Sequence, residues 1–152
     1  LFNNVLIAAD DPTHPFFSSF HMPVTGQGEG DLGERMHRQS ELAFACGAKG
    51  VLLLGCDSPH MAEQRLLQAS ELLHKYDIIL GPVEDGGYDL LAMNGNYPIF
   101  KTIQWLTARV LEQTLARIDL LPCTYKLLEH SFDVDFPVDI SRAEAAGWNR
   151  YT

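Results

Sequence analysis

The sequence predicts an α/β domain in three layers, with a Rossmann-like, mostly parallel sheet between helices on both faces. Short apolar runs without polar alternation are typical of strands that are buried on both faces. The longer segments between these runs carry apolar residues at every third or fourth position, which is typical of helices that pack on a sheet. Buried strands are predicted at 4–9, 51–54 and 77–80, and helices over 32–46, 61–75 and 110–118.

Length and composition fit one such domain. The chain has 152 residues, of which 46% are hydrophobic and 20% charged, so we expect a single globular domain over 1–152. Acidic residues outnumber basic ones 20 to 11. We therefore expect no nucleic-acid partner, because nucleic-acid binding needs a basic face. Neither the charge nor the aromatic content requires an oligomer, so we expect a monomer or a weak dimer.

Cysteine spacing and hydropathy indicate the compartment. The three cysteines form no CxxC or CxxH pattern, which favours reduced thiols over a zinc site or a disulfide framework. No apolar run approaches the roughly 18 residues of a membrane span, and no signal-peptide pattern opens the chain. We expect a cytoplasmic protein without a membrane partner.

Asp57 follows the most apolar of the predicted strands, Val51–Leu54, after only two residues. In open α/β sheets, ligands bind at the edge where strands reach their carboxyl ends. A carboxylate there is costly to desolvate unless a cation pairs with it, and oxygen ligands suit Mg²⁺ or Mn²⁺. The alternative is that Asp57 caps the helix that starts near Met61. The stretch by itself leaves both interpretations open.

Four glycines lie between Thr25 and Met36, where the chain enters the first helical pattern. Glycine allows close approach of a ligand to the backbone, and helix N-termini favour anions. Arg35 is placed to hold a phosphate or a carboxylate. The stretch matches no general phosphate-binding motif, and the residues alone favour a mobile loop with an exposed arginine.

Gly86-Gly87 predicts a tight hairpin turn that leads into a strand over Tyr88–Met93. Three carboxylates lie close to this turn in the sequence: Glu84, Asp85 and Asp89. Their negative charges repel one another, unless a cation or the hydroxyls of a sugar bind to the carboxylate oxygens.

Two further segments carry candidate residues. Phe100–Thr107 is predicted to open a helix with Thr107 as its N-cap, and Trp105 there either covers the core or lines a pocket. Near the end of the chain, a short strand is predicted to run from Ser131 to a helix start at Pro137. Asp133 and Asp135 would then share one face of that strand. Helix capping is the alternative, and it suits Asp139 better.

Together, five ordered stretches resemble one known family, over about Gly30 to Asp139. They are GDLGERM (30–36), VLLLGCDSP (51–59), DIILGPVEDGGYDLLAM (77–93), IQWLTARVLEQT (103–114) and DVDFPVD (133–139). Their order and spacing resemble the bacterial DUF2064 family of selenodomain-associated, glycosyltransferase-like proteins. The resemblance implies the GT-A nucleotide-diphospho-sugar transferase fold. It also implies kinship with the nucleotidyltransferases of the molybdenum cofactor and coenzyme F420.

The resemblance also implies roles for particular residues. Asp57 and Asp135 would bind the metal, with Asp133 as the fallback for Asp135, and Asp85 would be the base for the acceptor. The stretch expected near the nucleotide comprises Gly30, Asp31, Leu32, Gly33 and Arg35. The residues expected at the sugar or acceptor are Asp85, Gly86, Gly87 and Tyr88, with Trp105 and Thr107 from the tryptophan segment.

The chain departs from the family pattern at several places. Family members usually begin with a strand and a KxPxxGxxKTRL-like loop that would cradle the nucleotide phosphates. No such segment is found in this sequence, so we expect a domain that lacks both. Cys56 stands where threonine is usual, Asp89 where tyrosine is usual, and Leu106 where serine is usual.

The function implied is metal-dependent transfer of a glycosyl group from a nucleotide sugar to an acceptor that the residues do not identify. The metal would bridge Asp57, Asp135 and the diphosphate, and would neutralise charge on the leaving nucleoside diphosphate. Two alternatives stay open. One is a nucleotidyltransferase, in which the same metal would assist attack on a nucleoside triphosphate with release of pyrophosphate. The other is a non-catalytic domain that binds a nucleotide or a partner.

Overall fold

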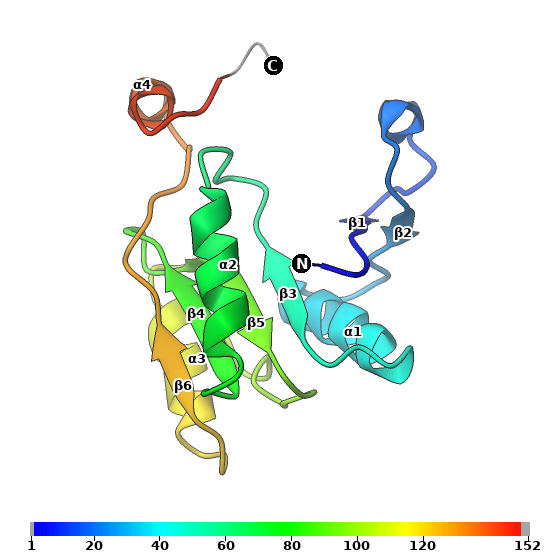
Figure 1. The fold of residues 1–152 in the computed structure, drawn as a ribbon, viewed down its shortest axis with the longest axis vertical. Helices are drawn as coiled ribbons and strands as arrows, with labels where there is room; N and C mark the ends of the chain where they lie inside the picture. The colour runs from blue at the N-terminus through cyan, green and yellow to red at the C-terminus, as the bar shows by residue number, and fades with distance from the viewer. Residues whose placement is uncertain (1, 150–152) are drawn as a thin grey trace.

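The computed structural model describes residues 2–149. The helices and strands there alternate along much of the chain (Figure 1). The elements in order are β1 (Ile7–Ala9), the 3-10 helix η1 (Pro15–Ser19), β2 (Val24–Gly26), α1 (Leu32–Ala45), β3 (Val51–Leu54), α2 (Glu63–Leu72), β4 (Ile78–Pro82), β5 (Tyr88–Met93), α3 (Val110–Ile118), β6 (Tyr125–Leu127) and α4 (Pro137–Ala145). Across these residues, no helix is long and apolar enough to cross a bilayer.

The main sheet has four strands in the order β3-β5-β4-β6. Strands β3, β4 and β6 run in one direction, while β5 lies antiparallel between β3 and β4. The predicted α/β class is therefore confirmed, but the sheet is mixed rather than mostly parallel. The physical reason is the predicted hairpin, because the few residues between β4 and β5 can only return the chain antiparallel to itself.

Alternation along the strands divides the core into two halves, one on each face of the sheet. On one face, Ile78, Leu80 and Leu91 pack with side chains of α1 and α3. On the other face, Ile79 and Leu90 pack with side chains of α2. Helices therefore cover both faces, and the predicted three layers are confirmed (Figure 1).

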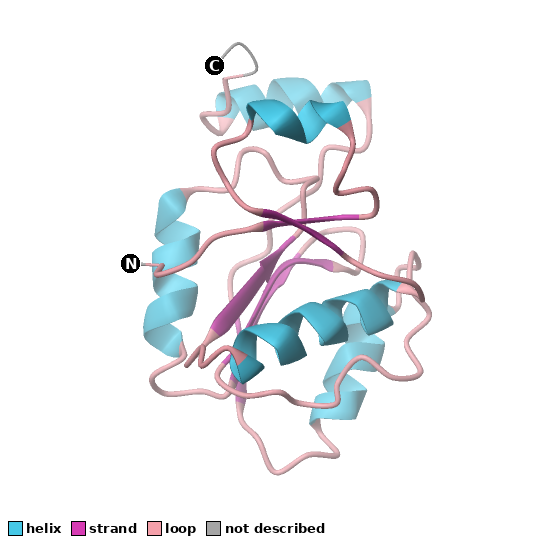
Figure 2. Cartoon of the chain, turned by 90° about the vertical axis from the view of Figure 1, so that its right-hand side faces the viewer, coloured by secondary structure: helices cyan, strands magenta, loops and turns pink. Residues whose placement is uncertain are grey.

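The N-terminal segment forms a second, two-stranded sheet. Strands β1 and β2 pair in parallel, with Ile7 opposite Val24. In the view turned by 90°, these strands and α1 lie in front of the four-stranded sheet (Figure 2). The predicted strand over 4–9 is thus confirmed for its last three residues only.

Because β3, β4 and β6 run in one direction, their carboxyl ends meet at one edge of the sheet, and β5 begins there. The loops 55–62, 83–87 and 128–136 therefore gather at this edge. The strand predicted from Ser131 is wrong, since only an isolated bridge joins Ser131 to Val83. Strand β4 has already ended at Pro82, so the chain beyond Ser131 has no neighbour for a ladder.

Two capping roles considered from the sequence, those of Asp57 and Thr107, are wrong. Helix α2 has Ala62 as its N-cap and no side-chain cap, which rules out the capping role for Asp57. Helix α3 has Arg109 as its N-cap and begins at Val110. The chain cannot be helical earlier because Leu106 has φ of 63°, in the left-handed region. Thr107 instead accepts a hydrogen bond from the Arg109 N–H at 3.3 Å, in the turn before the helix.

Candidate functional site

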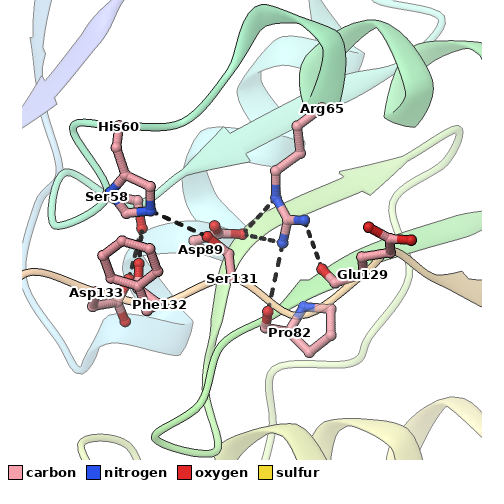
Figure 3. Close-up of polar contacts among 9 residues, drawn as sticks. All are labelled: Ser58, His60, Arg65, Pro82, Asp89, Glu129, Ser131, Phe132 and Asp133. Carbon is pink, nitrogen blue, oxygen red and sulfur yellow. Dashed lines mark hydrogen bonds and ion pairs between the residues drawn. The ribbon is translucent and has the colours of Figure 1, made fainter. Parts of the chain in front are cut away.

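Two segments about 75 residues apart meet at the carboxyl edge of the sheet. The Val134 N–H donates to the Asp57 carbonyl at 2.8 Å. The buried Ser58 hydroxyl lies 2.7 Å from Asp133 Oδ1 and 3.3 Å from the Phe132 carbonyl (Figure 3). The loop after β3 is therefore fastened to the segment before α4, and Asp57 lies beside that junction.

Asp133 is surrounded by other carboxylates. Burial raises its pKa, the Ser58 hydrogen bond opposes that shift, and the charges of Asp85, Asp89 and Asp57 raise the pKa further. Asp57 and Asp85 themselves are exposed, and the Cys56 thiol lies 3.4 Å from Asp57 Oδ1. The local field therefore favours a cation, and the donors are the hard oxygens that suit Mg²⁺ or Mn²⁺.

The fit of a metal can be judged from these donors. Between residues 2 and 149, no three His, Cys, Asp or Glu side chains are already arranged to hold a metal ion. A cation at Asp57 and Asp133 would complete its shell with water and with oxygens of a substrate, as Mg²⁺ does on nucleotide phosphates. The residues present fit a metal that arrives with a phosphate ligand.

Asp135 is placed differently from Asp133. It is exposed, and its N–H lies 3.3 Å from Asp139 Oδ2, which also accepts from the Phe136 N–H at 2.9 Å. Asp139 therefore caps α4, as the alternative interpretation expected. The contacts join Asp133 to the Asp57 loop, and metal binding by Asp135 stays a prediction.

An ion pair that the sequence did not indicate lies under this edge. Arg65 of α2 contacts Asp89 Oδ1 through Nη2 at 2.9 Å and donates from Nη1 to the Glu129 carbonyl at 2.7 Å (Figure 3). The Asp89 side chain is 0% exposed, and its Oδ2 has no hydrogen-bond partner in the described part of the chain. A Cβ on Gly81 would lie 2.5 Å from Asp89 Oδ1, so glycine leaves the space for this pair.

An aromatic stack closes one side of the site. The His60 ring stacks on Phe132 with centroids 3.9 Å apart, and the Arg142 guanidinium lies 3.8 Å from the Phe132 centroid. Arg142 also binds both oxygens of Glu84, at 2.5 and 2.7 Å. These contacts tie α4 to the loop after β4. Burial is the main cause that lowers the pKa of His60, against the charges of Asp89 and Asp133.

The glycine-rich stretch is held by its own side chains. Asp31 caps α1 by accepting from the Glu34 N–H at 2.8 Å, and Glu34 accepts in return from the Asp31 N–H. Arg35 donates to the Gly30 carbonyl at 3.0 Å and to Gln27 at 3.1 Å. Arg35 is therefore bonded to the loop rather than free, and the place of this loop near a nucleotide stays a prediction.

Gly33 and Trp105 bring two of the five stretches together. A Cβ on Gly33 would lie 2.7 Å from Trp105 Cζ2, so the indole rests directly on the first turn of α1. Trp105 Nε1 is buried and finds no hydrogen-bond partner among residues 2–149. Leu32 beside them is 44% exposed. The contact joins GDLGERM to the tryptophan segment at one surface.

The turn at 85–88 lies against the start of α3. Gly86 has φ of 91°, and a Cβ there would overlap the Ala108 carbonyl; the Leu111 N–H donates to the Gly86 carbonyl at 2.9 Å. Asp85 Oδ1 accepts from the Gly87 N–H at 2.8 Å, which fixes the exposed carboxylate. The residues beneath are Tyr88 and Thr114, whose hydroxyls lie 3.4 Å apart, and burial raises the pKa of Tyr88 to about 12.

Thus Asp57 and Asp133 belong to two segments that are hydrogen-bonded to each other, the charge of Asp85 acts on Asp133, and Trp105 packs on Gly33 of α1. Thr107 is exposed at the turn before α3 and Tyr88 lies below the 85–88 turn. The substrate roles expected for these residues stay predictions. Sequence reasoning missed several residues that shape the site: His60, Arg65, Phe132 and Arg142. Of these, only Phe132 and His60 could have been suspected from the sequence, because they lie close to Asp133 and Asp57 along the chain.

Comparison with known proteins finds solved structures of similar fold. Among them is a crystal structure from Desulfovibrio desulfuricans G20 described as a "putative nucleotide-diphospho-sugar transferase", with 28% identity and a TM-score of 0.80. The match covers 87% of this chain and 61% of that chain, so this chain spans about three fifths of the other's length. A search of curated proteins found no match.

The sequence also matches the profile of a family described as uncharacterised proteins conserved in bacteria, DUF2064, over residues 3–107. This range includes the loop of Asp57, the turn at 85–88 and Trp105, and it ends before Asp133 and α4. The match covers more than half of the chain and agrees with the fold of the Desulfovibrio protein. The chain belongs to the DUF2064 family.

Proposed function

We propose that this chain is a metal-dependent nucleotide-diphospho-sugar transferase that moves a glycosyl group from a nucleotide sugar to an acceptor. The observation that carries the proposal is the Ser58–Asp133 hydrogen bond, which joins the loop of Asp57 to the segment of Asp133, where the charges of Asp85 and Asp57 raise the pKa of Asp133. The likeness to the Desulfovibrio protein supports it. The position at the carboxyl ends of strands is where ligands bind in open α/β sheets.

Asp57 and Asp133 are the residues that we propose to hold Mg²⁺ or Mn²⁺. When bound, the cation would neutralise negative charge on the leaving nucleoside diphosphate. The raised pKa of Asp133 supports this assignment, because a cation relieves the repulsion that disfavours its ionised form. Ser58 keeps the Asp133 oxygen in place, and the Val134–Asp57 backbone bond keeps the two loops in register.

The other groups of the site would position the substrate. Asp85 is exposed and fixed by the Gly87 N–H, so it is placed to accept the proton of an acceptor hydroxyl. The loop braced by Arg35 would lie along the nucleotide, with Trp105 on the same surface. Positioning of this kind supplies much of the rate in transfers to bound acceptors.

A thermal-shift screen tests the proposal. Nucleotide sugars and nucleoside triphosphates are compared with Mn²⁺ and with EDTA. We expect a nucleotide sugar to stabilise the chain only with Mn²⁺, by about 2.7 kcal/mol at a hundred times its dissociation constant. Release of the nucleoside diphosphate, with the glycosyl group passing to an added hydroxyl compound or to water, then identifies glycosyl transfer. Release of pyrophosphate from a triphosphate would replace it with nucleotidyl transfer, and binding without either product would indicate a binding domain.

A further inference from the structure

We propose that the hollow between residues 59–62 and 146–149 is an acceptor subsite that binds a neutral sugar ring against Trp148. That the bound sugar is the acceptor rests on the proposed glycosyl transfer. That a sugar binds at all rests on the hollow itself. The two sides belong to the loop after β3 and to the chain that follows α4, which approach each other at one end of the molecule (Figure 1).

The size and lining of the hollow fit a small neutral ligand. Its volume is about 400 Å³, within the range of roughly 300–1,000 Å³ that ligand pockets occupy. Within residues 2–149, the lining contains no Asp, Glu, Lys or Arg, which favours a neutral ligand. The residues that line it are Pro59, His60, Met61, Ala62, Ala146, Gly147, Trp148 and Asn149.

The backbone fixes Trp148 at the wall of this hollow. Helix α4 ends in a Schellman motif, in which Gly147 donates to the Glu144 carbonyl and Trp148 to the Ala143 carbonyl, both at 3.0 Å. Gly147 has φ of 103°, a backbone conformation that residues other than glycine rarely adopt. The helix therefore ends before Gly147, and Trp148 lines the hollow.

The chemistry of the wall selects a sugar. Trp148 is half-buried, so it offers a rigid apolar surface with a polar N–H. The electron-rich face of an indole attracts the polarised C–H groups of a pyranose ring. His60 adds a second aromatic ring to the lining.

His60 also connects the hollow to the carboxylate site. Its ring stacks on Phe132, and its Nε2 lies 3.4 Å from Ser131 Oγ, next to Asp133 in the chain. Pro59 in the lining directly follows Ser58, which binds Asp133. A sugar against Trp148 would therefore lie beside the loop that carries Asp57.

Fluorine NMR of protein labelled with fluorotryptophan tests the subsite, because the chain has only two tryptophans. Trp148→Phe assigns the two resonances. Titration with methyl α-D-glucopyranoside and methyl β-D-galactopyranoside should shift the Trp148 resonance saturably and leave Trp105 unmoved. UDP-glucose or GDP-mannose with Mn²⁺ should shift Trp105. No saturable shift of Trp148 by either methyl glycoside overturns the subsite.

A matched pair of variants gives the control. Ala62→Phe fills the hollow from the exposed start of α2 and should abolish the Trp148 shift, whereas Ala145→Phe adds the same group to an exposed position outside the lining. Equal shifts in both variants would also overturn the subsite. If methyl glycosides shift Trp148 but nucleotide sugars shift nothing, the subsite stands and the proposed transfer fails.

Discussion

Ser58 and Asp133 form a 2.7 Å hydrogen bond between the loop after β3 and the segment before α4. The bond lowers the pKa of Asp133, but burial and the charges of Asp85, Asp89 and Asp57 outweigh it. The carboxylate is thus held in position while its surroundings disfavour its ionised form. A cation bound beside Asp133 would favour its ionised form.

The first prediction concerns Asp133→Asn and pH. The raised pKa of Asp133 means that folding favours its protonated form, so its contribution to stability is present at acid pH and is lost as pH rises above about 4. We expect the unfolding free energy of Asp133→Asn, relative to wild type, to increase as pH rises from about 3 to 7. Urea unfolding at a series of pH values measures this difference.

Asp77→Asn is the matched comparison, with the opposite sign. The Thr124 N–H and hydroxyl lower the pKa of Asp77, so its contribution is present at neutral pH and is lost as pH falls. Its relative stability should decrease as pH rises. Parallel slopes for the two variants would show that folding does not raise the pKa of Asp133.

The second prediction concerns Ser58→Ala. The buried hydroxyl binds both Asp133 and the Phe132 carbonyl, so its loss should cost about 1–3 kcal/mol of unfolding free energy. Urea unfolding checks this value, with Ser141→Ala on the exposed side of α4 as the control. Equal stability of the two variants would mean that the junction contributes nothing to the fold.

The third prediction concerns Arg65. Removal of its side chain leaves Asp89 buried without a cation, and we expect Arg65→Ala to cost about 3–5 kcal/mol. The control is Arg109→Ala, because Arg109 pairs with Glu112 where the side chains are 59% and 71% exposed. That change should cost no more than about 1 kcal/mol. Similar losses in chemical unfolding would contradict a structural role for the buried pair.

The fourth prediction compares two glycines that have nearly the same backbone conformation. Gly47 has φ of 93° and an added Cβ would meet nothing within 4 Å, so Gly47→Ala should cost about 1–2 kcal/mol from strain alone. Gly86 has φ of 91°, but its Cβ would overlap the Ala108 backbone. Gly86→Ala should therefore lose clearly more stability and displace Asp85, which calorimetric unfolding and amide exchange of Gly87 would report.

Local patterns predicted the layers of the fold, because apolar runs and helical stripes report burial directly. The stripe at Val110, Thr114 and Ile118 faces the core as expected. The hairpin at Gly86-Gly87 was likewise predicted from two residues that favour a tight turn. The helix start near Thr107 was predicted wrongly, because the positive φ of Leu106, 63°, is not indicated by any neighbouring residue in the sequence.

The site was predicted only in part, because its contacts join distant segments. Asp57 and Asp85 are visible as carboxylates at a strand end and a turn. The choice between Asp133 and Asp135 depends on Ser58, which lies 75 positions from Asp133. Arg65 looks like a surface residue of an amphipathic helix, and only the fold shows that it reaches a buried aspartate.

The most direct test of the central claim is binding of Mn²⁺, followed by the electron paramagnetic resonance signal of the free ion. Wild-type protein should take up one Mn²⁺ together with the nucleotide sugar that gives the largest thermal shift. Asp57→Asn and Asp133→Asn should lose this uptake, with melting temperatures equal to or above wild type because repulsion between carboxylates is relieved. Asp119→Asn, at the exposed end of α3, should retain it. Uptake of Mn²⁺ by Asp57→Asn and Asp133→Asn with wild-type affinity would contradict the metal site and the proposed transfer.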